Sequence, residues 1–90
     1  MTADRREELT PLVSAAQRVA GVVAARGRGD FDGARELMLS FDSERELASG
    51  ALLVAEISLG MLRRETGEPL DDCVHDLCLH LEAGLDAGPA

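Results

Sequence analysis

The chain of 90 residues contains no lysine, no asparagine, no tryptophan and no tyrosine, and all nine of its basic residues are arginine. Without lysine there is no phosphate-binding loop of the GKS or GKT type and no Schiff-base chemistry of the pyridoxal phosphate kind. Phe31 and Phe41 are the only aromatic residues, and the formal net charge is −8. Nucleic acids and anionic membranes bind positively charged surfaces, and the bases of nucleic acids also stack on aromatic side chains. We therefore expect neither as a partner.

Long hydrophobic runs are also missing. The most apolar stretch, "ALLVAEISLGML" at 51–62, is too short to span a bilayer and contains Glu56. The first ten residues, "MTADRREELT", are charged and lack the apolar segment of a secretory signal, which predicts a cytoplasmic protein. In a reducing compartment, Cys73 and Cys78 are expected to be free thiols.

The apolar residues that are present favour helices. They make up 46% of the chain and are mainly Leu, Ala and Val, which predicts an all-α fold. A chain of this length buries only roughly 60 to 65% of its unfolded surface, so it supports one core. We expect a single helical domain over 1–90, with residues 1–9 and 86–90 frayed or loose.

Periodicity and capping signals predict a compact bundle of four helices. Thr10 and Pro11 indicate a first helix start, Asp30 caps the second helix, and Ser43 with Glu46 has the spacing of a capping box. Glycines mark three ends: the "RGRG" segment, Gly67 and Gly84. The expected helices cover about 11–26, 31–41, 43–66 and 69–84.

The third of these helices is the longest and is apolar around most of its circumference. Its apolar arc consists of Leu47, Ala51, Val54, Ala55, Ile57, Ser58, Met61 and Leu62. Such a helix is expected at the centre of a bundle, packed by neighbours on several sides. Gly50, Ala51 and Ala55 would allow one neighbour to approach closely.

The segment "DDCVHDLCLH" at 71–80 gathers two cysteines, two histidines and three aspartates. On a helical wheel, a buried stripe is predicted from Leu70, Val74, Leu77, Cys78, Leu81 and Leu85. Cys73 and His80 flank the stripe, whereas Asp72, His75, Leu79 and Glu82 face away. The cysteines are thus expected at the edge of the core, and their Cα atoms, about 8 to 9 Å apart, cannot be bridged within the helix.

The same segment leaves a metal site open as an alternative. Asp76 with His80, and Asp72 with His75, are spaced so that each pair can present two ligands to one ion. The chain has only this one set of spaced Asp and His residues, and the helical wheel places Asp72 and His75 on the solvent side. We therefore expect no bound metal and no cofactor, and keep a metal- or small-ligand-binding protein as an alternative.

No catalytic residue is expected. Ser49 is followed by glycine, but no glycine precedes it at the spacing of a nucleophile elbow, and its predicted position is inside a helix. We interpret it as a small side chain that permits close packing. The chain is accordingly predicted not to be an enzyme.

Four leucines miss the predicted core stripes and indicate an interaction surface: Leu39, Leu52, Leu59 and Leu79. Together with the apolar overhang of the long third helix, they predict a homodimer that packs its third or fourth helix against its mate. The leading hypothesis is a small non-catalytic adaptor or regulatory module that also binds an unidentified protein. A further alternative is an acidic mimic or binder of a basic partner, through Asp30, Asp32, Asp71, Asp72 and Asp76.

Overall fold

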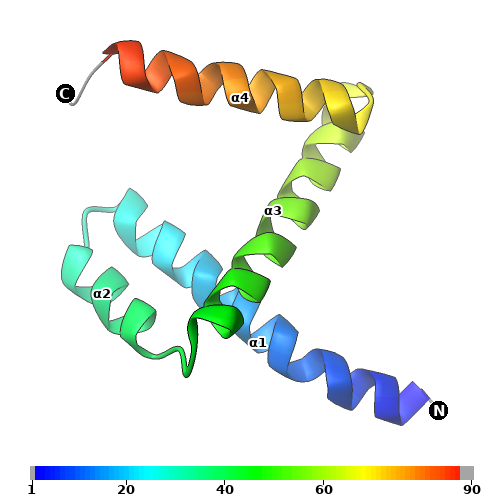
Figure 1. Cartoon of the computed structure of the whole chain (residues 1–90), viewed down its shortest axis with the longest axis vertical. Coiled ribbons are helices and arrows are strands. Elements are labelled where there is room, and N and C mark those ends of the chain that lie inside the picture. Colours follow the sequence, from blue (N-terminus) through cyan, green and yellow to red (C-terminus); the bar gives the residue numbers. More distant parts are fainter. Residues whose placement is uncertain (1, 88–90) are drawn as a thin grey trace. The chain divides into compact units, whose positions relative to one another are not determined.

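The computed structural model describes the backbone of residues 2–87 and the side chains of residues 5–85. Within these residues the chain forms four helices and no strand, which confirms the all-α prediction (Figure 1). The helices are α1 (Thr2–Gly27), α2 (Phe31–Leu39), α3 (Glu44–Thr66) and α4 (Leu70–Ala87). None of them has a stretch long and apolar enough to cross a membrane.

The chain divides into two compact units, one reaching to Ala55 and one starting at Glu56. The first contains α1, α2 and the first half of α3, and the second contains the rest of α3 and α4. The single domain expected over 1–90 stays a prediction. Of the ends expected to be loose, residues 2–9 and 86–87 lie in helices, and residues 1 and 88–90 lie outside the described residues.

The start of α1 differs from the prediction, which placed Thr10 as a cap and Pro11 in the first turn. The helix begins at Thr2, and Thr10 Oγ1 donates a hydrogen bond to the carbonyl oxygen of Arg6 at 2.7 Å. This bond to the residue four positions earlier is typical of threonine inside a helix. The helix-forming residues before Pro11 extend the helix upstream, although proline removes one backbone hydrogen bond there.

The predicted stops of two helices are also displaced. Gly84 was expected to end the last helix, but α4 continues to Ala87, and within residues 2–87 the positive-φ glycines are Gly29 and Gly67. The second helix was expected to reach Phe41, but α2 ends at Leu39 because Ser40 caps it. Both the backbone N–H and the hydroxyl of Ser40 donate to the carbonyl oxygen of Leu37, at 3.1 and 2.6 Å.

The predicted end of α1 and the predicted cap of α2 are confirmed. Gly29, with φ of 80°, closes α1, and the N–H groups of Gly29 and Asp30 donate to the carbonyl oxygens of Arg26 and Ala25 at 3.1 and 2.9 Å. This pair of bonds is a Schellman motif. Asp30 Oδ1 then accepts from the Gly33 N–H at 2.9 Å and caps α2. One sharp turn therefore ends α1 and starts α2.

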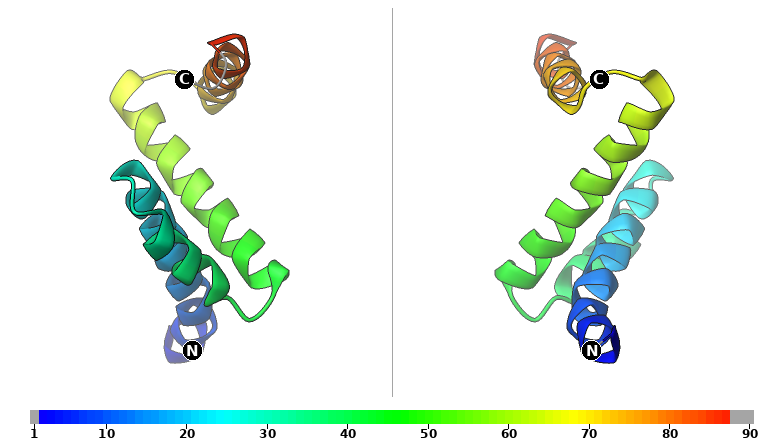
Figure 2. Two further views of the ribbon diagram at one scale, coloured as in Figure 1. Left: turned by 90° about the vertical axis from the view of Figure 1, so that its left-hand side faces the viewer. Right: turned by 90° about the vertical axis from the view of Figure 1, so that its right-hand side faces the viewer.

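The core of the first unit is small and built mainly from alanine. Val22, Ala25 and Ala34 are buried together, and Leu37 packs against them, so α2 lies against the second half of α1 (Figures 1 and 2). Gly21 gives Leu37 room, because a Cβ there would lie 3.2 Å from Leu37 Cδ1. Short side chains let the two helices approach closely but bury few carbon atoms.

The first half of α3 contacts α1 through Gly50, as its composition predicted. A Cβ at Gly50 would lie 2.8 Å from the carbonyl carbon and 3.0 Å from the Cβ of Ala15. Both residues are buried. The backbone of α3 thus rests on α1, and a side chain at this position would push the two helices apart.

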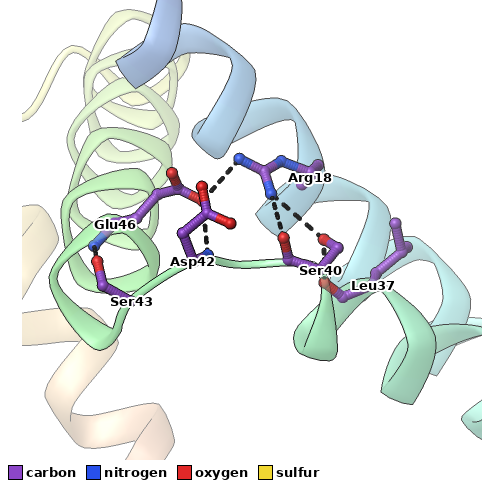
Figure 3. Close-up of polar contacts among 6 residues, drawn as sticks. All are labelled: Arg18, Leu37, Ser40, Asp42, Ser43 and Glu46. Atoms are coloured by element: carbon purple, nitrogen blue, oxygen red, sulfur yellow. Dashed lines mark hydrogen bonds and ion pairs between the residues drawn. The ribbon is translucent and has the colours of Figure 1, made fainter.

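An arginine fastens the connection between α2 and α3 to α1 (Figure 3). Arg18 donates to the carbonyl oxygen and hydroxyl of Ser40 at 3.0 and 3.3 Å and to Glu46 Oε1 at 2.8 Å. Its guanidinium carbon lies 4.5 Å from the centroid of the Phe41 ring. Ser43 Oγ accepts from the Glu46 N–H at 3.1 Å, so this half of the predicted capping box is present. The other half differs, because Glu46 Oε1 accepts from the Asp42 N–H and from Arg18.

Candidate interaction surface

The start of α4 concentrates negative charge. The N–H groups of Asp72 and Cys73 donate to the carbonyl oxygen of Pro69 at 3.1 and 3.2 Å, and Asp71 and Asp72 lie in the first turn. Carboxylates are favourable there because they complement the helix macrodipole. The pKa of Glu68 is raised, first by repulsion from Asp76, then by partial desolvation, a hydrogen bond with the Asp76 side chain and repulsion from Asp72. Asp76 and Asp72 are therefore close enough to oppose the ionisation of Glu68.

The four residues of the metal alternative do not gather around one point. Asp72, His75, Asp76 and His80 are all exposed, and His80 Nδ1 hydrogen-bonds the backbone carbonyl oxygen of Asp76 at 2.9 Å. Among the described residues there is no group of three or more His, Cys, Asp or Glu side chains placed to hold an ion. The predicted pairs thus lack a third protein ligand in this structure.

The two cysteines lie in different environments, and both are free, as predicted. Cys73 is completely buried, and its sulfur lies 3.9 Å from the hydroxyl oxygen of Thr66 at the end of α3. Cys78 is exposed. Cys73, expected at the edge of the core, is the buried one, whereas Cys78, expected in the buried stripe, is not.

Within the second unit, the predicted buried stripe of α4 is exposed, whereas the sequence predicted its burial. Its leucines and valine are exposed by fractions from 39% at Val74 to 82% at Leu85. We call this surface the α4 stripe: Leu70, Val74, Leu77, Cys78, Leu81 and Leu85. A continuous apolar face of this kind is rarely left uncovered on a helix of a soluble monomer, which makes the α4 stripe a candidate contact surface.

The leucines predicted as an interaction surface fall in both units. In the first unit, Leu39 is 78% exposed and Leu52 is 61% exposed. In the second, Leu79 is 49% exposed and Leu59 is only partly exposed. Three of the four are thus available for contact.

Most of the apolar arc of α3 is also exposed, although Leu47 and Val54 are half-buried. Gly50 is the buried residue of this helix, whereas Ile57, Met61 and Leu62 are exposed. The sequence predicted that neighbours would pack around this arc. The second unit therefore presents exposed apolar residues on both of its helical segments.

The first half of α1 has an exposed apolar face that was not predicted from the sequence. Leu9 and Val13 are each 45% exposed and form a shallow groove with Arg5, Arg6, Thr10, Ser14 and Gln17. Leu9 and Val13 are four positions apart, which is a helical signal. The signal was overlooked because the helix was predicted to begin only at Pro11.

A second shallow groove lies between α1 and α3 in the first unit. Its lining consists of Glu8, Pro11, Leu12, Ala15, Glu46 and Ser49. Ser49 is exposed here, not packed as predicted. No histidine lines this groove, so Ser49 has no imidazole beside it to act as a base.

Comparison of the chain with protein-family models, with curated proteins and with solved structures gives no match.

Proposed function

We propose that the chain is a small non-catalytic protein-interaction module, an adaptor or regulatory subunit, that acts as a homodimer in the cytoplasm. The observation that supports this proposal is the exposure of the α4 stripe. Isolated exposed leucines are common on soluble proteins, but a row of them on one helical face costs free energy until another apolar surface covers it. A protein partner supplies such a surface.

The exposed residues of α3 extend the same argument. Ile57, Met61 and Leu62 belong to the same unit as α4. We propose that the compact bundle expected around α3 forms in the dimer, where a second copy contributes to the packing. In this arrangement the chain needs its partner to complete its core.

The test of this proposal is the mass of the full chain in solution by light scattering, from about 1 to about 100 µM. We expect a two-chain mass at the upper end. As a second measurement, the tagged wild-type chain and the tagged Leu52→Ser variant are used separately to capture proteins from the cells in which the chain occurs, and the captured proteins are compared. A partner held by the wild-type chain and lost with Leu52→Ser supports the module. A one-chain mass throughout, with normal helicity and no protein captured above background, would overturn it.

A second candidate function is the binding of a basic partner at the start of α4. It is favoured by the mutual repulsion among Glu68, Asp72 and Asp76, which a cationic partner would relieve. This candidate predicts that partner binding weakens steeply with salt, because exposed charges are screened at high ionic strength. Binding that is unchanged between about 0.05 and about 0.5 M salt would exclude it.

A further inference from the structure

We propose that the α4 stripe pairs with the same stripe of a second copy, with the two α4 helices antiparallel and related by a two-fold axis between Leu77 and Cys78. This inference rests on the proposed homodimer and names its contact surface. It is argued from the spacing of the apolar residues, from their exposure and from the charges on α4.

The first argument is the symmetry of the stripe. Its six positions are arranged symmetrically about the midpoint between Leu77 and Cys78. In an antiparallel pair centred there, Leu70 lies level with Leu85 of the partner subunit, and Val74 lies level with Leu81 of the partner subunit. Every apolar residue then meets an apolar residue, as an interface of two identical patches requires.

The second argument is that the stripe is free within its own unit. The contact of α4 with the end of α3 is made by Cys73, which is buried and lies beside the stripe on the helical wheel. The stripe itself stays exposed, by 64% at Leu81 and 82% at Leu85. A second helix can therefore approach this face without breaking the contact at Cys73.

The charges on α4 favour the antiparallel direction. The first half of α4 carries Asp71, Asp72 and Asp76, with Glu68 just before it, whereas the second half carries Glu82 and Asp86. In a parallel pair the two acidic first halves would lie at the same end of the pair. In the antiparallel pair they lie at opposite ends, which separates the two clusters of negative charge. The helix dipoles also oppose each other in this arrangement.

A matched pair of variants on α4 tests the face that makes the contact. Leu81 lies in the stripe and Leu79 lies on the opposite side of the helix, and both are exposed. We expect Leu81→Glu to weaken dimerisation at least tenfold, because it places a charge in an apolar contact, while Leu79→Glu leaves the dimer intact. Circular dichroism of both variants shows whether the helices are retained.

A disulfide experiment tests the direction. Two chains are prepared without the native thiols (Cys73→Ala, Cys78→Ser), one with Val74→Cys and one with Leu81→Cys, and are oxidised separately and as a mixture. In the antiparallel pair the two engineered cysteines lie level, whereas two copies of position 74 are about 10 Å apart along the axis, beyond disulfide reach. We expect the mixed disulfide only.

The outcomes separate this inference from the proposed homodimer. A dimer that survives Leu81→Glu, or that is lost with Leu79→Glu instead, overturns the stripe as the contact but leaves the homodimer standing. Disulfides between like positions, without the mixed product, overturn the antiparallel direction. A monomer at about 100 µM that Leu81→Glu destabilises shows that the stripe is covered within one chain, and both proposals then fail.

Discussion

At the scale of single residues, Gly50 is the position where one added carbon matters most. A Cβ there meets the backbone of Ala15 at 2.8 Å, and backbone cannot move aside as a side-chain end can. We expect Gly50→Ala to lower the free energy of unfolding by about 1 to 3 kcal/mol, although alanine is the better helix former. Urea denaturation measures the change.

Gly60, in the same helix, is the control for this substitution. Nothing lies within 4 Å of a Cβ built there. Gly60→Ala is therefore expected to raise the free energy of unfolding by about 0.5 to 1 kcal/mol through helix propensity alone. Equal effects at the two positions would show that the contact between α3 and α1 does not persist in solution.

The second prediction at this scale concerns Arg18, whose side chain is 28% exposed and pairs with Glu46. Arg18→Ala removes three hydrogen bonds and the contact with the Phe41 ring. We expect a loss of about 1 to 2 kcal/mol, most of it from the charge-assisted bonds, since partial exposure weakens the ion pair.

Arg35, an exposed arginine on α2, provides the comparison. Arg35→Ala is expected to change the free energy of unfolding by less than about 0.5 kcal/mol. If both variants unfold at the same urea concentration as the wild-type chain, Arg18 does not hold the connection between α2 and α3.

At the scale of the element, the start of α4 should give the protein a pH-dependent stability. Glu68 has a raised pKa, chiefly because Asp76 repels its charged form. The folded state thus binds the proton more tightly than the unfolded state does. The stabilisation is fully present below the ordinary pKa of glutamate and is lost as the pH rises through the raised pKa of Glu68.

Glu68→Gln should remove this dependence. The variant is expected to resemble the wild-type chain at about pH 3.5 and to be more stable than it at about pH 7, as judged by urea midpoints. Asp76→Asn, which removes the main source of repulsion, should give a similar gain at neutral pH. A difference between Glu68→Gln and the wild-type chain that is the same at both pH values would contradict the prediction.

The helices themselves were predictable to the extent that local chemistry determines them. The turn at Gly29 and Asp30 and the stop at Gly67 follow from residues that favour those backbone conformations, and all three are present. Pro11 and Gly84 gave the wrong boundaries because both residues are tolerated inside a helix when the flanking sequence is strongly helical.

The covering of the apolar faces could not be predicted in the same way. A helical wheel shows that Leu70 to Leu85 form one apolar stripe, but periodicity does not say which molecule covers that stripe. The prediction of burial required other helices of the same chain to cover the stripe, and within the second unit these residues are exposed. The four leucines outside the predicted stripes were interpreted as an interaction surface. The exposed α4 stripe is a second candidate for such a surface, with more apolar residues on one helical face.

At the scale of the whole molecule, dimerisation should make the melting temperature depend on protein concentration. Mass action stabilises the folded dimer as concentration rises, by about 1.4 kcal/mol of dimer for each tenfold increase. For a chain of this size we expect a rise of several degrees over a hundredfold range. Leu81→Glu should melt at a temperature independent of concentration, and a wild-type melting temperature that stays constant would argue against the dimer.

The alanine-rich core of the first unit has a calorimetric consequence. This core buries few carbon atoms, because it consists of Val22, Ala25 and Ala34. Unfolding of an isolated chain would therefore expose little apolar surface to water. Its heat-capacity increment and its urea slope should both fall below those of other 90-residue domains, and its stability curve should be broad and flat. If the stability curve is steep for the wild-type chain and flat for Leu81→Glu, most of the apolar surface that folding buries lies between the subunits.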